Sequence, residues 1–99
     1  MNRLEGKVAV VTGANSGVGA AIAKLFAAEG ATVVMTARRE AALEEVSAQI
    51  EEAGGKTFVM ATDISKPDDP ERLMAAVEEK YGKIDVLVNN AGILESGLK

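Results

Sequence analysis

The chain has 99 residues, of which 47% are hydrophobic and 26% are charged, a balance typical of one small globular domain and not of a disordered segment. Its net charge is -4 without any basic tract, which argues against nucleic acid or an anionic membrane as its main partner. The absence of cysteine and histidine excludes disulfides, the usual zinc sites and a histidine general base. No apolar stretch is long enough for a membrane span or a signal peptide, so the sequence predicts a cytoplasmic protein.

The first part of the chain predicts a strand, a helix and a second strand. Residues 7–11 are a continuous β-branched apolar run, as expected of a buried parallel strand. Residues 32–36 repeat this pattern, and Gly30 before them suits the left-handed end of a helix. The helix between the two strands is expected to bury the apolar residues at helical spacing, namely Val18, Ile22, Leu25 and Phe26.

The second part continues the alternation. Residues 40–53 predict a helix that stops at Gly54-Gly55, and residues 57–62 predict the third strand. Asp69 is expected to cap the third helix, with Pro70 as its first helical residue. The expected buried faces of these two helices are Leu43, Val46 and Ile50 for the first, and Leu73, Val77 and Tyr81 for the second.

The order β-α-β-α-β-α-β, completed by a strand over 85–89, implies a parallel sheet with helices on both faces. We expect an α/β fold of three layers, a half-Rossmann domain over residues 1–99 whose four parallel strands lie in the order 3-2-1-4. In that order the third helix alone covers the second face. Exposed Val86, Leu87 and Val88 would then attract a second copy of the chain, so we expect a homo-oligomer through strand four or the uncovered face.

A glycine-rich turn joins the first strand to the first helix, with the sequence Thr12-Gly13-Ala14-Asn15-Ser16-Gly17-Val18-Gly19. Gly13 can take a left-handed conformation, whereas Gly17 and Gly19 have no Cβ to block a pyrophosphate or the helix's approach to the sheet. The helix start offers unpaired N–H groups and a partial positive charge, which suit a phosphate. The alternative is that the glycines serve only a tight turn and close packing. The strand before and the helix after favour phosphate binding.

This spacing, Gly-x3-Gly-x-Gly after a threonine, resembles the cofactor turn of the short-chain dehydrogenase/reductase family. The resemblance covers nearly the whole chain, up to about Gly92, because three further motifs follow in the family's order. It implies dinucleotide contacts at the residues of the turn, which are Gly13, Asn15, Ser16, Gly17, Val18 and Gly19.

The second motif follows the second strand, where Ala37 is succeeded by Arg38 and Arg39. A cofactor ribose with a free 2′-hydroxyl is usually bound here by an acidic residue, which this chain lacks. Guanidinium groups suit a 2′-phosphate because they donate paired, charge-assisted hydrogen bonds. We therefore expect NADP (NADPH) to be preferred over NAD. The alternative is that one arginine pairs with Glu40 or coats the surface.

Two more motifs follow strands three and four. The resemblance implies that Asp63 bonds the adenine amino group and that the backbone of Ile64 lies close by; the alternative is an Asx-turn that organises the loop. Small residues at Ala91 and Gly92 let a backbone lie against a flat ring and sugar, while Asn90 supplies polar contacts. The alternative is that Asn-Asn-Ala-Gly forms only a turn, which is typical of this sequence when it occurs without the other motifs.

Complete members of the family resemble doubly wound domains whose later half carries a serine and a Tyr-x3-Lys pair for proton transfer, with hydride moving to or from the nicotinamide. Tyr81 is followed by Lys83 and not by a lysine four residues on, and its helical spacing predicts a packing role. We nominate no catalytic residue and no metal ligand. Three functions remain open: an NADP-binding half-domain without turnover, a fragment of an NADP-dependent oxidoreductase, and a structural or engineered assembly unit with negligible cofactor affinity.

Overall fold

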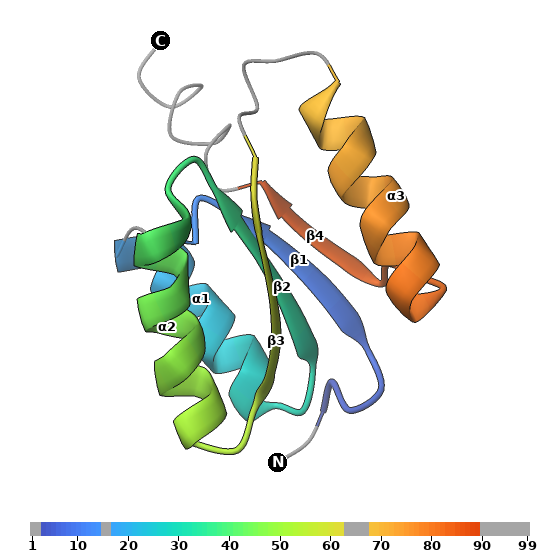
Figure 1. The fold of residues 1–99 in the computed structure, drawn as a ribbon. Helices are drawn as coiled ribbons and strands as arrows, with labels where there is room; N and C mark the ends of the chain where they lie inside the picture. The colour runs from blue at the N-terminus through green and yellow to red at the C-terminus, as the bar shows by residue number, and fades with distance from the viewer. Residues whose placement is uncertain (1–2, 15–16, 63–67, 90–99) are drawn as a thin grey trace, which may run out of the picture.

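The computed structural model describes residues 3–14, 17–62 and 68–89, which form a parallel sheet with helices on both faces (Figure 1). The strands are β1 (Val8–Thr12), β2 (Thr32–Ala37), β3 (Lys56–Ala61) and β4 (Val86–Asn89). They pair in the order β3-β2-β1-β4, and every pairing is parallel. The strand order 3-2-1-4 expected from the sequence is therefore confirmed. In the central register Val10 lies opposite Val34 on β2 and Leu87 on β4.

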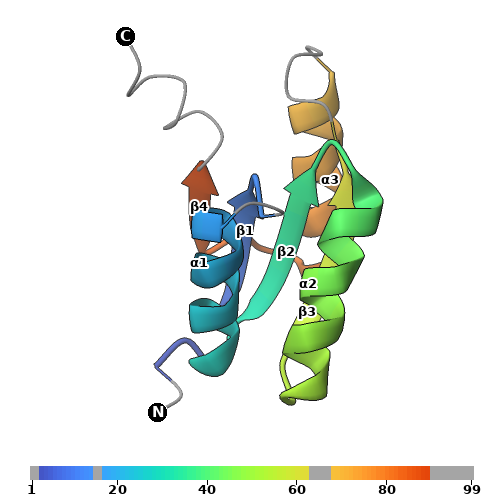
Figure 2. The same ribbon diagram turned by 90° about the vertical axis from the view of Figure 1, so that its left-hand side faces the viewer.

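The helices that connect these strands are α1 (Gly17–Ala28), α2 (Glu40–Glu52) and α3 (Asp69–Tyr81). Helices α1 and α2 lie against one face of the sheet and α3 lies against the other, as Figures 1 and 2 show from two directions. The three-layer architecture is thus confirmed. After each helix the chain turns through a left-handed glycine, with φ of 98° at Gly30, 94° at Gly54 and 81° at Gly82, a conformation that glycine adopts without steric cost.

The sheet separates two apolar cores because successive residues of a strand point to opposite faces. On the side of α1 and α2, Val11 and Met35 pack with the predicted face of α2, and Leu43, Val46 and Ile50 are all buried. On the other side, Val10 and Val34 pack against Leu73 and Val77 of α3, as predicted. Burial on both faces explains why the strands read as continuous apolar runs.

Helix α1 packs through small residues and through only part of the stripe expected from the sequence. Val18 and Leu25 are each 59% exposed, whereas Gly19 and Ala23 are buried. The prediction was wrong for Val18 and Leu25 because α1 carries apolar residues around most of its circumference, so spacing alone does not identify the face toward the sheet. The small residues let the helix axis approach β1 closely, with Ile22 and Phe26 partly buried at the sides.

Helix α3 begins one residue earlier than predicted. Asp69 is its first residue and Asp68 precedes it, so the assignment of Asp69 as the N-cap and Pro70 as the first helical residue was wrong. The carboxylate of Asp69 instead accepts a hydrogen bond from Arg72 at 2.8 Å, one turn along the helix. A carboxylate in the first turn still complements the positive end of the helix dipole.

Strand β4 exposes less apolar surface than expected. Leu87 is 53% exposed, but Val86 and Val88 are partly buried and pack against the core under α1 and α2. Alternate residues of a strand face opposite sides of the sheet. The layer formed by α1 and α2 therefore covers both valines, whereas Leu87 points toward the face against which α3 lies.

Candidate cofactor-binding site

The glycine turn leaves β1 at the carboxyl edge of the sheet and leads directly into α1. Gly13 has a φ of 65°, which is the left-handed conformation predicted for it. A Cβ at Gly19 would lie 2.2 Å from the carbonyl oxygen of Gly13, so its absence lets α1 start against the turn. A Cβ at Gly17 would meet nothing within 4 Å in the described part of the chain. One glycine therefore serves packing, and the other faces open space at the helix start.

The start of α1 differs electrostatically from the starts of the other two helices. Its first turn contains no acidic residue, whereas that of α2 contains Glu40 and that of α3 contains Asp69 and Glu71. Carboxylates in a first turn neutralise the partial positive charge of the helix N-terminus. The positive end of α1 is not neutralised in this way, which suits a phosphate group.

Hydrogen bonds hold the turn to the strands on both sides of β1. The hydroxyl of Thr12, at the end of β1, is 7% exposed and donates to the carbonyl oxygen of Val88 on β4 at 3.3 Å. The backbone N–H of Ala14 donates to the carbonyl oxygen of Thr36 on β2, also at 3.3 Å. The position of the turn therefore depends on both neighbouring strands.

Arg38 and Arg39 leave β2 at this same carboxyl edge, and both side chains are exposed. The backbone of Arg39 is extended, with φ of -109° and ψ of 112°, immediately before α2 begins. The ion pairs among the described residues join Arg72 to Asp69 and Lys83 to Asp85, so neither arginine pairs with Glu40 there. The structure thus does not support the alternative that Glu40 holds one of them.

The remaining predicted contacts lie outside the described residues: Asn15, Ser16, Asp63, Ile64, Asn90, Ala91 and Gly92. Their roles, and the Asx-turn alternative for Asp63, stay predictions. The residues that lead into these segments are described, and all follow strands at the carboxyl edge: Ala14 after β1, Thr62 after β3 and Asn89 at the end of β4.

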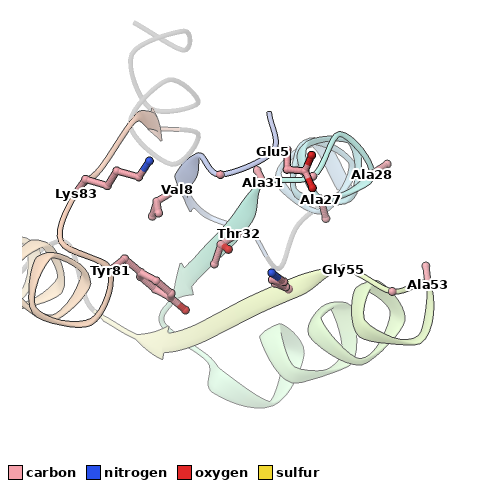
Figure 3. A pocket seen from close by; sticks show the side chains of 14 residues that line it. Glu5, Val8, Ala27, Ala28, Ala31, Thr32, Ala53, Gly55, Tyr81 and Lys83 are labelled. Atoms are coloured by element: carbon pink, nitrogen blue, oxygen red, sulfur yellow. The ribbon is translucent and has the colours of Figure 1, made fainter. Parts of the chain in front are cut away.

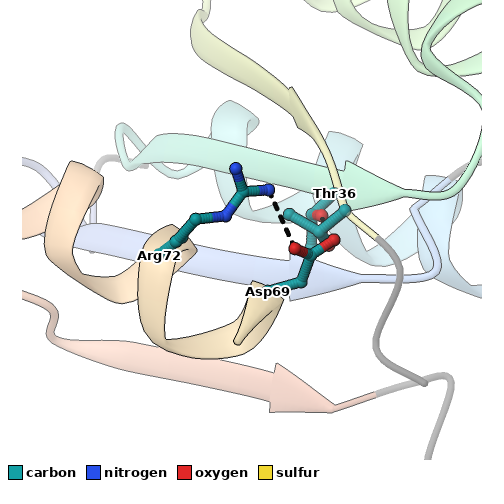
Figure 4. A network of polar contacts seen from close by, with 4 residues as sticks. Thr36, Asp69 and Arg72 are labelled. Atoms are coloured by element: carbon teal, nitrogen blue, oxygen red, sulfur yellow. Dashed lines mark hydrogen bonds and ion pairs between the residues drawn. The ribbon is translucent and has the colours of Figure 1, made fainter. Parts of the chain in front are cut away.

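A buried pair of hydroxyl groups at this edge was not predicted from the sequence. Thr36 and Thr62 are 1% and 4% exposed, and their Oγ1 atoms form a hydrogen bond of 2.5 Å. The backbone N–H of Thr62 also donates to the carbonyl oxygen of Ala37 at 2.9 Å. Figure 4 draws Thr36 together with the ion pair between Asp69 and Arg72, which the dashed line marks. A threonine at the end of an apolar strand was the available signal, but threonine is also an ordinary strand former.

A hollow of about 510 Å³ lies at the opposite, amino edge of the sheet (Figure 3). The first residues of β1, β2 and β3 line it, together with the chain just after α1 and α2. Helix C-termini carry partial negative charge, so this edge disfavours phosphate. Lys56 and Lys83 also line the hollow, but Lys83 is paired with Asp85 at 3.3 Å. None of the predicted cofactor residues lines it.

Tyr81 at this amino edge has a packing role, as predicted. Its ring meets Phe58 edge to face with 6.2 Å between centroids, and the Lys80 ammonium lies 5.3 Å from the centroid of Phe58. Burial raises the pKa of Tyr81 above its usual value. A raised pKa disfavours the tyrosinate form of this side chain.

Asp85 fastens the beginning of β4 to that of β1. Its carboxylate accepts a hydrogen bond from the backbone N–H of Val8 at 2.8 Å and pairs with Lys83. The bond from Val8 has the largest effect and lowers the pKa of Asp85 below its usual value; burial opposes it, and the nearby Lys83 and Lys7 add to the lowering. The two edges of the sheet therefore differ: the amino edge is fastened by a carboxylate, and the carboxyl edge presents N–H groups and arginines.

A parallel sheet in this order, with a glycine turn and exposed arginines at its carboxyl edge, defines an α/β dinucleotide-binding fold of the Rossmann type. The sequence model of the short chain dehydrogenase family matches residues 7–99, and the chain therefore belongs to that family. It is 51% identical over 94 residues to a "3beta-hydroxysteroid dehydrogenase" of Mediterraneibacter gnavus. It is 48% identical over 95 residues to the farnesol dehydrogenase of Aedes aegypti.

Solved structures agree with this assignment. A metagenomic short-chain oxidoreductase in complex with NADP superposes with a TM-score of 0.86 and 46% identity, over 88% of this chain and 39% of that one. A hydroxysteroid dehydrogenase from Escherichia coli gives a TM-score of 0.85 and 39% identity, over 88% of this chain and 37% of that one.

The chain spans a minor part of the length of these relatives. The alignments cover 95% of this chain but 34% of the Mediterraneibacter protein and 39% of the Aedes protein. None of the described helices is long and apolar enough to cross a membrane. The described residues also contain no group of three or more acidic, histidine or cysteine side chains able to hold a metal ion.

Proposed function

We propose that this chain binds NADP(H) at the carboxyl edge of its sheet and prefers NADPH to NADH. The observation that carries the proposal is the geometry at the start of α1, where Gly19 packs against Gly13 and a Cβ at Gly17 would meet no described atom within 4 Å. Because the first turn of α1 carries no acid, the N–H groups there favour the pyrophosphate. A structural relative that contains NADP supports the choice of ligand.

The preference for NADPH rests on Arg38 and Arg39. Both are exposed directly after β2, where a free ribose 2′-hydroxyl is usually bound by an acid, and both can donate forked hydrogen bonds to a 2′-phosphate. We place Asp63 and Ile64 at the adenine, and Asn90, Ala91 and Gly92 at the nicotinamide ribose side. In the sequence these five residues follow β3 and β4, which both end at the carboxyl edge.

The test is a calorimetric titration of the 99-residue chain with NADPH and with NADH. Replacing Arg38→Ala together with Arg39→Ala should weaken NADPH by about 1.5 to 3 kcal/mol for each lost charged hydrogen bond, or roughly tenfold per 1.4 kcal/mol. NADH binding should barely change. A matched control, Lys7→Ala with Lys56→Ala, removes the same charge at the amino edge and should leave both affinities nearly unaltered. Equal losses for the two cofactors, or no binding by the unaltered chain, would refute the proposal.

A second candidate is hydride transfer between the nicotinamide and an alcohol or carbonyl, carried out by a longer protein that contains this chain. It is favoured by the lengths and names of the relatives, which include a farnesol dehydrogenase. A protein extended beyond Lys99 that oxidises no alcohol with either cofactor would count against it. The third possibility, an assembly unit with negligible cofactor affinity, predicts no heat of binding in the titration above.

We also propose that two copies of the chain associate through β4, in the cytoplasm. Leu87 is 53% exposed, and β4 is the last strand of the described sheet, so it offers apolar surface beside unpaired backbone groups. Light scattering at micromolar concentration should give the mass of a dimer, and Leu87→Lys should reduce it to a monomer. If the unaltered chain is a monomer at this concentration, the proposed association through β4 is wrong. The cytoplasmic location is tested separately, by fractionating cells that produce the chain.

A further inference from the structure

We infer that Thr36 and Thr62 are positioning residues for the adenosine end of the dinucleotide, which rests on the proposed function. Their two hydroxyl groups form a buried hydrogen bond between the end of β2 and the residue that follows β3. With 1% and 4% of their surface exposed, neither side chain is available to touch a ligand. Any effect on binding must therefore act through the backbone that each residue carries.

Thr36 connects three of the segments that the proposed site uses. Its carbonyl oxygen accepts the N–H of Ala14 in the glycine turn, and its hydroxyl bonds Thr62. Arg38 follows it by two residues, and Asp63 is the next residue after Thr62. The residues proposed for the pyrophosphate, the 2′-phosphate and the adenine thus include Gly17, Arg38, Arg39 and Asp63, each within three residues of Thr36, Thr62 or Ala14.

The pair also lies next to the last register position between β2 and β3. The backbone pairing of these strands ends at Ala37 opposite Ala61, and the N–H of Thr62 then donates to the carbonyl oxygen of Ala37 at 2.9 Å. The hydroxyl bond lies beside that last backbone bond and restrains the direction in which both strands leave the sheet. Sites that bind through several groups lose affinity when the spacing of those groups is no longer fixed.

Packing alone does not require two hydroxyl groups at this place. Valine has nearly the same shape as threonine, and replacing both members of a buried polar pair by apolar groups is close to neutral for stability. Replacing one member leaves the other hydroxyl buried without this partner, which is costly. Stability and positioning therefore respond differently to single and double replacements, and this difference allows the two roles to be separated.

The experiment compares Thr36→Val, Thr62→Val and the double variant with the unaltered 99-residue chain. Urea denaturation measures stability, and calorimetry measures the affinity for adenosine 2′,5′-bisphosphate, which carries the adenine and the 2′-phosphate without the nicotinamide. We expect both single variants to lose stability and the double variant to regain most of it. The affinity should fall about tenfold, the effect of one hydrogen bond, in all three variants.

The conservative variants Thr36→Ser and Thr62→Ser keep the hydroxyl groups and lose a methyl group each. They should bind the bisphosphate as tightly as the unaltered chain even where their stability is lower. Affinity that returns together with stability in the double valine variant, or that never changes, overturns the positioning role while NADPH binding stands. If the unaltered chain binds neither the bisphosphate nor NADPH, the proposed function itself fails, and the positioning role fails with it.

Discussion

Two glycines of the cofactor turn, only two residues apart, should respond oppositely to the same substitution. In Gly19→Ala the new Cβ would lie 2.2 Å from the carbonyl oxygen of Gly13 and 2.8 Å from its carbonyl carbon. In Gly17→Ala it would enter open space in the described structure. Both residues belong to the first turn of α1, so differences in helix propensity largely cancel between the two variants.

The size of the effect at Gly19 follows from the contact. The gap must open by about 0.8 Å to reach 3.0 Å, below which real Cβ atoms essentially never come, and the opposing atoms are backbone. Overpacking of this kind costs about 1 to 3 kcal/mol, and alanine returns at most about 1 kcal/mol of helix propensity. Because backbone atoms cannot rotate away, we expect a net loss of about 2 kcal/mol, equivalent to a fall of roughly 8 to 16 °C in Tm.

The assay is thermal and urea denaturation followed by far-ultraviolet circular dichroism, with NADPH titration of the same samples. Gly17→Ala should be as stable as the unaltered chain or slightly more so, yet bind NADPH more weakly, because its methyl group occupies the space proposed for the pyrophosphate. Gly19→Ala should lose both stability and affinity. A Gly19→Ala chain of unaltered stability would refute the packing role, and undiminished NADPH affinity in Gly17→Ala would refute the placement of the pyrophosphate.

Two further predictions concern stability alone. The depressed pKa of Asp85 means that its ionised form stabilises the fold above the pKa of an unfolded aspartate, and that this contribution is lost as the pH falls through the folded value. The stability deficit of Asp85→Asn should therefore shrink as urea denaturation is repeated from pH 7 down to strongly acid pH; a deficit independent of pH contradicts this. Leu73→Ala, at a side chain 2% exposed, should cost about 2 to 5 kcal/mol, whereas the control Leu25→Ala, at 59% exposure, should stay within about 0.5 kcal/mol. Similar losses at both leucines would mean that α3 does not bury Leu73.

The sequence predicted the strands and their order because parallel strands buried on both faces carry a strong signal, such as the run Val8–Thr12. It also predicted the buried face of α2, where charged residues surround the apolar stripe and leave one choice. For α1 it was right about Ile22 and Phe26, which are partly buried against the core, and wrong about Val18 and Leu25, which are exposed. There the face toward the sheet is decided by the contact between Gly19 and Gly13, which joins the helix to a turn and is not a property of helical periodicity.

The candidate site shows the same division between local and non-local information. The glycine turn and the arginines could be proposed from the sequence because each is a short motif whose residue types follow from phosphate chemistry, and their binding role stays a prediction. The pair of Thr36 and Thr62 was not found, because the two residues are 26 positions apart and meet only through the pairing of β2 with β3. A hydrogen bond between two such hydroxyl groups can be predicted only when the order and register of β2 and β3 are known.

Net charge and local charge point in opposite directions for an anionic ligand of this chain. The charge of -4 opposes the approach of any phosphate, including those of NADPH. At physiological ionic strength, however, charges are screened over about 8 Å, and the radius of gyration is 12.6 Å, so acids on the far side contribute little at the carboxyl edge. At the proposed site, the nearest charges to a bound phosphate would be those of Arg38, Arg39 and the start of α1, whose first turn carries no acid. A long polyanion would instead face the acids of many elements at once, which is why the same composition that argues against nucleic acid is compatible with a dinucleotide.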